Sequence, residues 1–199
     1  MQIKAARDAG PGINREISRV FVEGFYPLLR HLCRDKARLA RAFEHMFKTE
    51  MFYVVLDGGR AAGILACTDG SAQCVSLDKA QLRRHLGFFR GSLAYASMHP
   101  QVDFLHYPFP LEEGMGTLEN LAVDSAYRGQ GIARLLMSYV IDTAPYSAYA
   151  LEVADNNTAQ QFYGRLGFKE VARAPQKFAR ITGTKANLYM KLHTEAVVK

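Results

Sequence analysis

A glycine-containing turn that leads directly into a helical pattern constrains this chain more than any other stretch. Residues 117–123 are apolar and β-prone, residues 124–129 are small or polar, and an amphipathic helix pattern follows from Gln130. The first backbone N–H groups of a helix lack partners within it, and the helix dipole adds partial positive charge there. Gly129 and Gly131 let the backbone approach a ligand closely, because neither has a Cβ atom. The stretch therefore predicts a site for a phosphate or pyrophosphate group.

Two common phosphate motifs do not fit this turn. A Walker loop ends in Gly-Lys-Ser/Thr, and that sequence is absent here. A dinucleotide fingerprint needs a third small residue where this chain has Arg134.

A third motif fits better. The pattern Arg128-x-x-Gly131-x-Ala133 resembles the acetyl-CoA-binding motif of the GNAT family of N-acetyltransferases. Downstream, the stretches Leu151-Glu152-Val153, Asn157-x-Ala159, Phe162-Tyr163 and Leu166-Gly167-Phe168 resemble the second half of the same core. The resemblance covers residues 115–173 closely and the rest of the chain in outline.

The resemblance implies an α/β fold built on a mixed, mostly antiparallel sheet of about seven strands flanked by helices. It also implies one acyl-CoA N-acyltransferase domain over residues 1–199. Residues 76–113 depart from the family pattern, in which the third strand passes almost directly to the fourth. We expect an inserted helix and loop there, beside the acceptor site, which either caps the pocket or contacts a second copy.

Hydrophobic periodicity predicts the remaining elements. Pro27 is expected to end or bend the first helix, and His99-Pro100 to end a later one. Residues 101–113 and 174–185 are expected to be loops. Helices are expected at 13–25, 35–47, 78–99, 130–143 and 158–165, and strands at 2–7, 52–56, 61–67, 72–77, 117–123, 148–153, 168–172 and 187–192.

The resemblance assigns the cofactor contacts. The backbone from Arg128 to Arg134 would hold the pyrophosphate. The end of the strand before it would splay from the next strand, pair with the pantetheine arm and polarise the acetyl carbonyl through one N–H group. Asn157 would either contact the cofactor arm or cap its own helix. The implied cofactor-binding residues are Leu121, Ala122, Val123, Arg128, Gly129, Gln130, Gly131, Ile132, Ala133, Arg134, Asn157 and Tyr163.

Acetyl transfer to an amine also needs an acid and a base. An alkylammonium has a pKa near 10.4 and must lose a proton before it can attack. Tyr163 matches the family tyrosine that points at the CoA sulfur, so it is the candidate acid. Glu119 and Glu152 both lie in apolar runs, where burial raises the pKa of a carboxyl, and either is a candidate base.

Aromatic side chains of the first helices form a second group of candidates. By resemblance these helices border the acceptor pocket, so the aromatics are either pocket walls or plain core. They are Phe21, Phe25, Tyr26, Phe43 and Phe47.

Together these patterns predict a cytoplasmic acetyl-CoA-dependent N-acetyltransferase. The expected acceptor is a small-molecule primary amine, and transfer is direct because no cysteine lies in a motif position. A protein N-terminal or lysine acetyltransferase stays open, indicated by Leu151-Glu152-Val153, as does a non-catalytic CoA-binding sensor. A homodimer is suggested only by family habit.

Composition bounds the alternatives. The net charge of +6 suits an anionic ligand such as CoA and also nucleic acid, but the basic residues are scattered, which favours a solvated surface. No apolar run approaches the length of a membrane span, and the N-terminus lacks the apolar core of a signal peptide. Cys33, Cys67 and Cys74 lack the spacing of metal ligands and are expected to be reduced thiols, so no metal is predicted.

Overall fold

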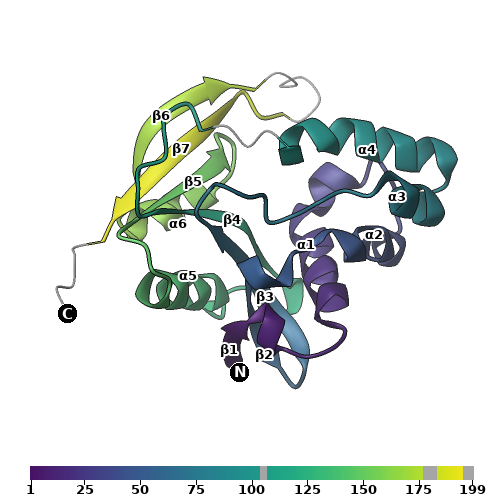
Figure 1. Ribbon diagram of the computed structural model, residues 1–199, viewed down its shortest axis with the longest axis horizontal. Coiled ribbons are helices and arrows are strands. Elements are labelled where there is room, and N and C mark those ends of the chain that lie inside the picture. The colour runs from purple at the N-terminus through teal and green to yellow at the C-terminus, as the bar shows by residue number, and fades with distance from the viewer. Residues whose placement is uncertain (104–106, 177–182, 195–199) are drawn as a thin grey trace.

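The computed structural model describes residues 1–103, 107–176 and 183–194, with the side chains of residues 100–103 left out (Figure 1). Short 3-10 turns precede or follow several of the main elements. In chain order the main elements are β1 (Gln2–Ala5), α1 (Ile13–Leu29), α2 (Lys36–Phe43), β2 (Phe52–Asp57), β3 (Arg60–Thr68), α3 (Lys79–Leu86), α4 (Phe88–Asp103), β4 (Met115–Val123), α5 (Ile132–Thr143), β5 (Ala148–Ala154), α6 (Ala159–Arg165), β6 (Lys169–Pro175) and β7 (Ala186–His193).

The strands form one seven-stranded sheet in the order β1-β2-β3-β4-β5-β7-β6. Neighbouring strands are antiparallel except β4 and β5, which run parallel and are joined through α5. The predicted mixed, mostly antiparallel sheet is therefore confirmed. The helices α3 and α4 lie between β3 and β4 in the chain, where the insertion was expected.

Helices cover both faces of the sheet, as the alternation along β3 shows. Ile64 and Ala66 pack into a core with α1 and α2, whereas Leu65 and Cys67 pack into a second core with α5. Figure 1 shows α1–α4 gathered at one side of the molecule and the β5–β7 strands at the other. The strands β4 and β5, which pair over only part of their length, lie where these two groups of elements meet.

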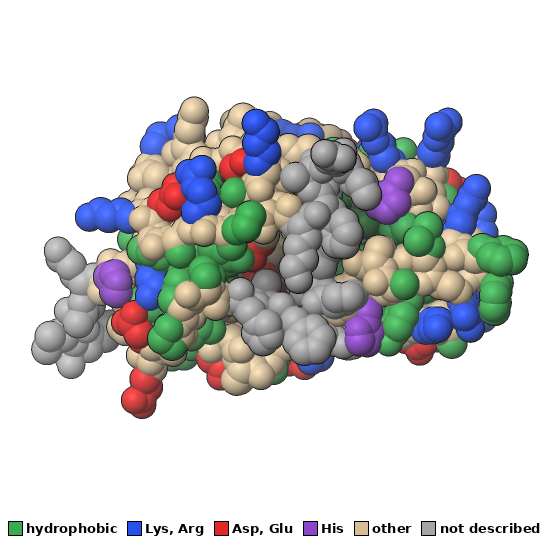
Figure 2. Space-filling model, turned by 90° about the horizontal axis from the view of Figure 1, so that it is seen from above, with side chains coloured by type: hydrophobic (Ala, Val, Ile, Leu, Met, Phe, Trp, Pro, Cys, Tyr) green, Lys and Arg blue, Asp and Glu red, His purple; other side chains and the backbone are tan. Residues whose placement is uncertain are grey.

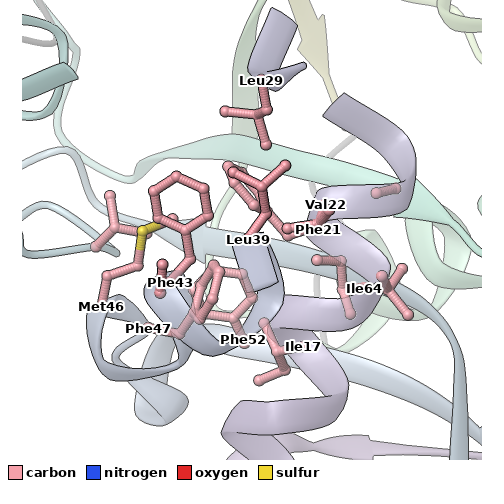
Figure 3. Close-up of a cluster of buried hydrophobic side chains, with 14 of the residues drawn as sticks. Ile17, Phe21, Val22, Leu29, Leu39, Phe43, Met46, Phe47, Phe52 and Ile64 are labelled. Carbon is pink, nitrogen blue, oxygen red and sulfur yellow. The ribbon is translucent and has the colours of Figure 1, made fainter. Parts of the chain in front are cut away.

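The core beside α1 contains three of the aromatic residues proposed as pocket walls (Figure 3). Phe21, Phe43 and Phe47 are at most 6% exposed, and the ring centroids of Phe21 and Phe47 are 5.4 Å apart. These three residues pack the core, which is the alternative that the sequence left open. Phe25 and Tyr26 lie at its edge and are partly buried.

The predicted helix over residues 78–99 is wrong in its extent, because Gly87 divides it. Gly87 has a φ of 88°, which no helix residue adopts, and it separates α3 from α4. The two helices then pack so closely that a Cβ atom on Gly91 would lie 2.5 Å from the Cα atom of Arg83. Glycine is thus required at both positions, once for the turn and once for the approach.

Neither proline ends its helix, although Pro27 was expected to end or bend one helix and His99-Pro100 to end another. The helix α1 continues past Pro27 to Leu29, and α4 continues past Pro100 to Asp103. Each proline lies within the last turns of its helix, where the missing N–H group removes one hydrogen bond without stopping the chain. The predicted strand at 72–77 is reduced to one bridge between Phe47 and Val75.

Residues 107–111, called the strap below, cover one face of the sheet. Tyr107, Phe109 and Leu111 pack against a small core formed by Met115, Ala148 and Ala150. The Tyr107 and Phe109 rings also lie 5.6 and 6.3 Å from the ring of Tyr189 on β7. The strap therefore caps the chain's own sheet. Residues 104–106 of the predicted 101–113 loop and 177–182 of the predicted 174–185 loop lie outside the described residues.

Candidate active site

The strands β4 and β5 separate halfway along their length. Their ladder runs from the pair Met115 and Ala148 to the pair Leu118 and Leu151, and no later pair follows it among the described residues. Residues 119–123 and 152–154 therefore diverge, and they form no ladder with each other. The divergence predicted for the end of β4 is confirmed.

A β-bulge on β4 lies at the start of this divergence. Ala66 pairs with Glu119 and Ile64 pairs with Ala122, so β4 has one more residue than β3 between the two pairs. Asn120, inside the bulge, has a φ of 54°, in the left-handed region that asparagine tolerates better than most residues. Such a bulge interrupts the ladder and redirects the strand, and bulges are frequent beside active sites.

A cavity of about 490 Å³ opens between the end of β4 and the helices α5 and α6. It brings together six of the twelve residues predicted to bind the cofactor: Leu121, Ala122, Val123, Ala133, Asn157 and Tyr163. Its other lining residues are Thr158, Ala159, Gln161, Phe162 and Arg165. Sequence reasoning missed these, although they belong to the stretch around α6 that carries the motif.

The turn before α5 has two glycines in the left-handed backbone conformation. Gly129 and Gly131 have φ values of 75° and 78°, and both are exposed. Within the described chain, the N–H groups of residues 129–134 donate to no backbone carbonyl. A Cβ atom on either glycine would meet no atom within 4 Å, so the glycines are required by their backbone conformation. Several free N–H groups at a helix N-terminus fit a pyrophosphate.

The side chains around this turn take different positions. Arg128 is exposed, and its Nε donates to the Val123 carbonyl at 3.4 Å. Gln130 and Arg134 are exposed as well, and none of the three lines the cavity. Ile132 is only 2% exposed and packs into the core, so it can offer a ligand only its backbone N–H group.

A buried carboxylate that sequence reasoning missed holds the turn in place. The Asp124 side chain is 3% exposed, contacts the guanidinium groups of Arg19 and Arg60, and accepts a hydrogen bond from the Ala126 N–H at 2.9 Å. Burial alone would raise the pKa of this carboxyl, but these contacts outweigh burial and lower its pKa to about 2. Arg19 lies 105 positions away in the chain, so no local pattern could have predicted the contact.

Asn157 makes the helix-end hydrogen bond that was one of its two expected roles. Its Oδ1 accepts a hydrogen bond from the Ala159 N–H at 2.9 Å, which caps α6. Its side chain also belongs to the cavity wall. The amide nitrogen is therefore the part of Asn157 that remains available to a bound cofactor.

Tyr163 lies on α6 and forms part of the cavity wall. Burial raises the pKa of its hydroxyl to about 12. The group therefore stays protonated at neutral pH and is available as a donor. Tyr163 packs with the core on the α5 side of the sheet.

The two candidate bases lie on the opposite face of the sheet from Tyr163. Leu118 and Leu151 pack into the core beside α5, so the next residues, Glu119 and Glu152, point away from it. Acid and base candidates thus approach the divergent strands from opposite faces. The gap between β4 and β5 is where they can act on one substrate.

Glu119 is half-buried and hydrogen-bonded. It accepts from the Cys74 thiol at 3.3 Å and from the Thr117 hydroxyl at 3.1 Å. Burial raises the pKa of its carboxyl, and these two hydrogen bonds oppose the rise only in part. A raised pKa brings a carboxylate closer to the range of an effective general base.

Glu152 stands directly across from Tyr189 in the β5–β7 ladder. It accepts hydrogen bonds from Tyr189 and from the Asn187 amide. Solvent reaches its surface, yet the surrounding protein removes enough water to raise the pKa of its carboxyl, and the charge of Glu119 adds to the rise. Glu119 and Glu152 each follow the last β4–β5 pair, Leu118 and Leu151, so the strand register brings both to the same face beside the divergence.

Comparison with known proteins agrees with this geometry. A family model described as an acetyltransferase (GNAT) domain matches residues 111–190. A [ribosomal protein bS18]-alanine N-acetyltransferase of Haemophilus ducreyi is 30% identical over 121 residues, which span 59% of this chain and 82% of that protein. An uncharacterized protein of Mycobacterium leprae is 39% identical over 62 residues, which span 31% of this chain and only 17% of that protein.

Solved structures show the same fold. An aminoglycoside 6'-N-acetyltransferase complexed with coenzyme A aligns with 97% of this chain and 97% of its own, at a TM-score of 0.55 and 12% identity. The Haemophilus ducreyi relative, of which this chain covers 82%, and the family model show the class: the chain belongs to the GNAT family of acetyltransferases. Enzymes of this class are acetyl-CoA-dependent N-acetyltransferases, as the sequence predicted.

No described helix is both long and apolar enough to cross a membrane. No cluster of three or more His, Cys, Asp or Glu side chains within the described ranges could hold a metal ion.

Proposed function

We propose that the chain transfers the acetyl group of acetyl-CoA directly to the primary amine of a small molecule. One observation carries this proposal. The cavity at the divergence of β4 and β5 has a protonated tyrosine, Tyr163, on its wall. Two carboxylates, Glu119 on β4 and Glu152 on β5, lie on the opposite face of the sheet, and the charge of Glu119 raises the pKa of Glu152.

Each residue has a role in this proposal. The N–H groups of residues 129–134 hold the pyrophosphate, and the free edge of residues 121–123 holds the pantetheine arm. Acetyl-CoA supplies the acetyl thioester. Glu119 or Glu152 takes a proton from the acceptor ammonium, and Tyr163 provides a proton donor for the leaving sulfur.

Direct transfer fits the state of the cysteines. A covalent route needs a thiolate nucleophile. Burial raises the pKa of the Cys67 thiol to about 12 and also raises the pKa of the Cys74 thiol, with Glu119 adding to both shifts. Both thiols therefore stay protonated and are poor nucleophiles at neutral pH.

A small acceptor is favoured by what covers the carboxylate face. The strap packs across β5 and β7 beside Glu152, and the segment before α3 contacts Glu119 through the Cys74 thiol. This cover leaves less room for a peptide than an open groove. A second candidate acceptor is a protein N-terminus, because the Haemophilus ducreyi relative is named for the alanine of a ribosomal protein.

The first test measures the binding of acetyl-CoA, CoA and NAD by the change in melting temperature that each compound causes. Gly131→Asp places a carboxylate in the expected pyrophosphate site. Gly10→Asp is a matched control, because Gly10 has a similar φ of 87° and equally open surroundings far from the turn. Stabilisation by the CoA compounds that survives in the control and vanishes in Gly131→Asp supports the proposal. No stabilisation of the unmodified protein by millimolar acetyl-CoA refutes it.

The second test identifies the acceptor. Release of CoA thiol is measured with a panel of small primary amines and with short peptides that begin with alanine. A higher kcat/KM for the small amines supports the proposed acceptor class. A higher value for the peptides establishes the second candidate in its place.

A further inference from the structure

The Tyr107 hydroxyl is a buried polar group without a hydrogen-bond partner in the described structure. Two other buried side-chain atoms share this state, on Asn14 and His45, but neither lies among the carboxylates of the site. Buried hydroxyl groups are nearly always paired, and an unpaired one calls for an explanation. A partner absent from the protein itself is one such explanation.

The packing of Tyr107 does not require the hydroxyl. Its ring stacks with Phe109 at 5.5 Å and with Tyr189 at 5.6 Å, within the apolar contacts of the strap. Phenylalanine at this position would make the same ring contacts without burying an unpaired hydroxyl. The hydroxyl is therefore an addition to the core that a bound hydrogen-bond partner would make favourable.

The surroundings of this hydroxyl are acidic. The Tyr107 ring lies 5.6 Å from the ring of Tyr189, which stands across from Glu152 in the β5–β7 ladder. Besides its burial, the charges of Glu119 and Glu152 raise the pKa of the Tyr107 hydroxyl, with smaller contributions from Tyr189 and Cys74. They come from β4, β5, β7 and the segment after β3, all on the sheet face that the strap covers. Acidic side chains are visible in the hollow of this face in Figure 2.

Two carboxylates in one site repel each other, and a cation between them removes the repulsion. No lysine or arginine is paired with Glu119 or Glu152 in the described part of the chain. A primary ammonium has three N–H donors. Two carboxylates and one tyrosine hydroxyl are three acceptor groups, one for each N–H of the ammonium.

We propose that Glu119, Glu152 and the hydroxyl of Tyr107 together bind the acceptor as its primary ammonium, so that Tyr107 is an acceptor-binding residue supplied by the strap. The inference rests on the proposed function and names the charged form of the acceptor that its site selects. It assigns the strap a role in recognition besides its packing on the sheet.

The test is a ligand-observed NMR titration of the CoA-saturated protein with n-butylammonium chloride. Butyltrimethylammonium, with the same charge and no N–H donor, is the matched probe. Tyr107→Phe is the variant, and Tyr146→Phe is its control, because Tyr146 is also half-buried but its electrostatic neighbours are Cys67, Asp69 and Tyr53. Thermal unfolding and the Kd for acetyl-CoA confirm that each variant is folded.

We expect Tyr107→Phe to weaken n-butylammonium binding about tenfold, as the loss of a hydrogen bond to a charged group does. Tyr146→Phe should leave it unchanged, and butyltrimethylammonium should bind the unmodified protein at least tenfold more weakly than n-butylammonium. Equal affinity in Tyr107→Phe, equal binding of the two probes, or no binding of n-butylammonium overturns the inference.

The two proposals fail in different ways. If the unmodified protein does not bind acetyl-CoA, the proposed function is refuted. Intact acetyl-CoA binding with an n-butylammonium affinity that is independent of Tyr107 removes only the ammonium site. In the first amine substrate found, Tyr107→Phe should raise KM for the amine and leave KM for acetyl-CoA unchanged.

Discussion

Replacing Asp124 by asparagine tests how the phosphate-binding turn is held. Asparagine keeps the size of the side chain and an oxygen for the Ala126 N–H, but it removes the charge that faces Arg19 and Arg60. We expect a less stable protein that also binds acetyl-CoA more weakly, because the turn leads directly to the glycines of the expected pyrophosphate site.

The magnitude follows from the pKa of the carboxyl. Folding lowers this pKa from 3.8 to about 2, and each unit corresponds to about 1.4 kcal/mol, so the charge contributes about 2–3 kcal/mol at neutral pH. Because the folded pKa is the lower one, this stability is present above pH 4 and is lost as the pH falls towards 2. At pH 3 roughly half of it should remain.

The assay is urea unfolding of the unmodified protein and Asp124→Asn at pH 7, 5, 4 and 3. Asp142→Asn, an exposed aspartate on α5, is the control and should change the free energy of unfolding by less than about 0.5 kcal/mol. Thermal unfolding at pH 7 should show a melting temperature about 4–8 °C lower in Asp124→Asn.

Two results would refute this reasoning. One is a decrease of less than about 0.5 kcal/mol in the free energy of unfolding at pH 7, since the Asp124 charge would then contribute little to stability. The other is a loss of equal size at pH 7 and pH 3. In that case the change would act through packing and not through the charge.

Three further predictions concern the site itself. Glu119→Gln and Glu152→Gln should differ in kcat, with a loss of about 100-fold for the base, and a loss below a few-fold in both excludes a base role for either. Tyr163→Phe should lower kcat at an unchanged Kd for acetyl-CoA, and an unchanged kcat would remove its proposed role as acid. Gly63→Ala would place a methyl group 2.6 Å from Cγ2 of Ile132 at the start of α5. We expect it to destabilise the protein by about 1–3 kcal/mol and to weaken acetyl-CoA binding. Unchanged stability and unchanged acetyl-CoA affinity would contradict this expectation.

The sequence predicted those parts of the molecule that depend on neighbours along the chain. The turn at Gly129 and Gly131 follows from residue types at fixed spacing before a helix, and the hairpin of β2 and β3 follows from two apolar runs around Gly58 and Gly59. Local backbone preferences decide such elements. Both were therefore visible without tertiary contacts.

Other parts depend on contacts between distant residues and were not visible. The bulge at Asn120 arises because β3 and β4 pair on both sides of one extra residue. Tyr107 lies against Tyr189 on β7 only because the strap folds back across the sheet. The sequence placed this segment beside the acceptor site, but no local pattern indicated which residue points inward.

The two edges of the sheet have a consequence for association. The edge strand β1 is only four residues long. At the other edge, β6 has a bulge between Glu170 and Ala172, an exposed ion pair between Glu170 and Arg173, and Pro175, which has no N–H group to donate. Short, charged, bulged or proline-containing edges resist the addition of a further strand. Self-assembly by sheet extension, which leads to aggregation, is therefore opposed at both ends, and a dimer of this chain would have to form through its helices or loops.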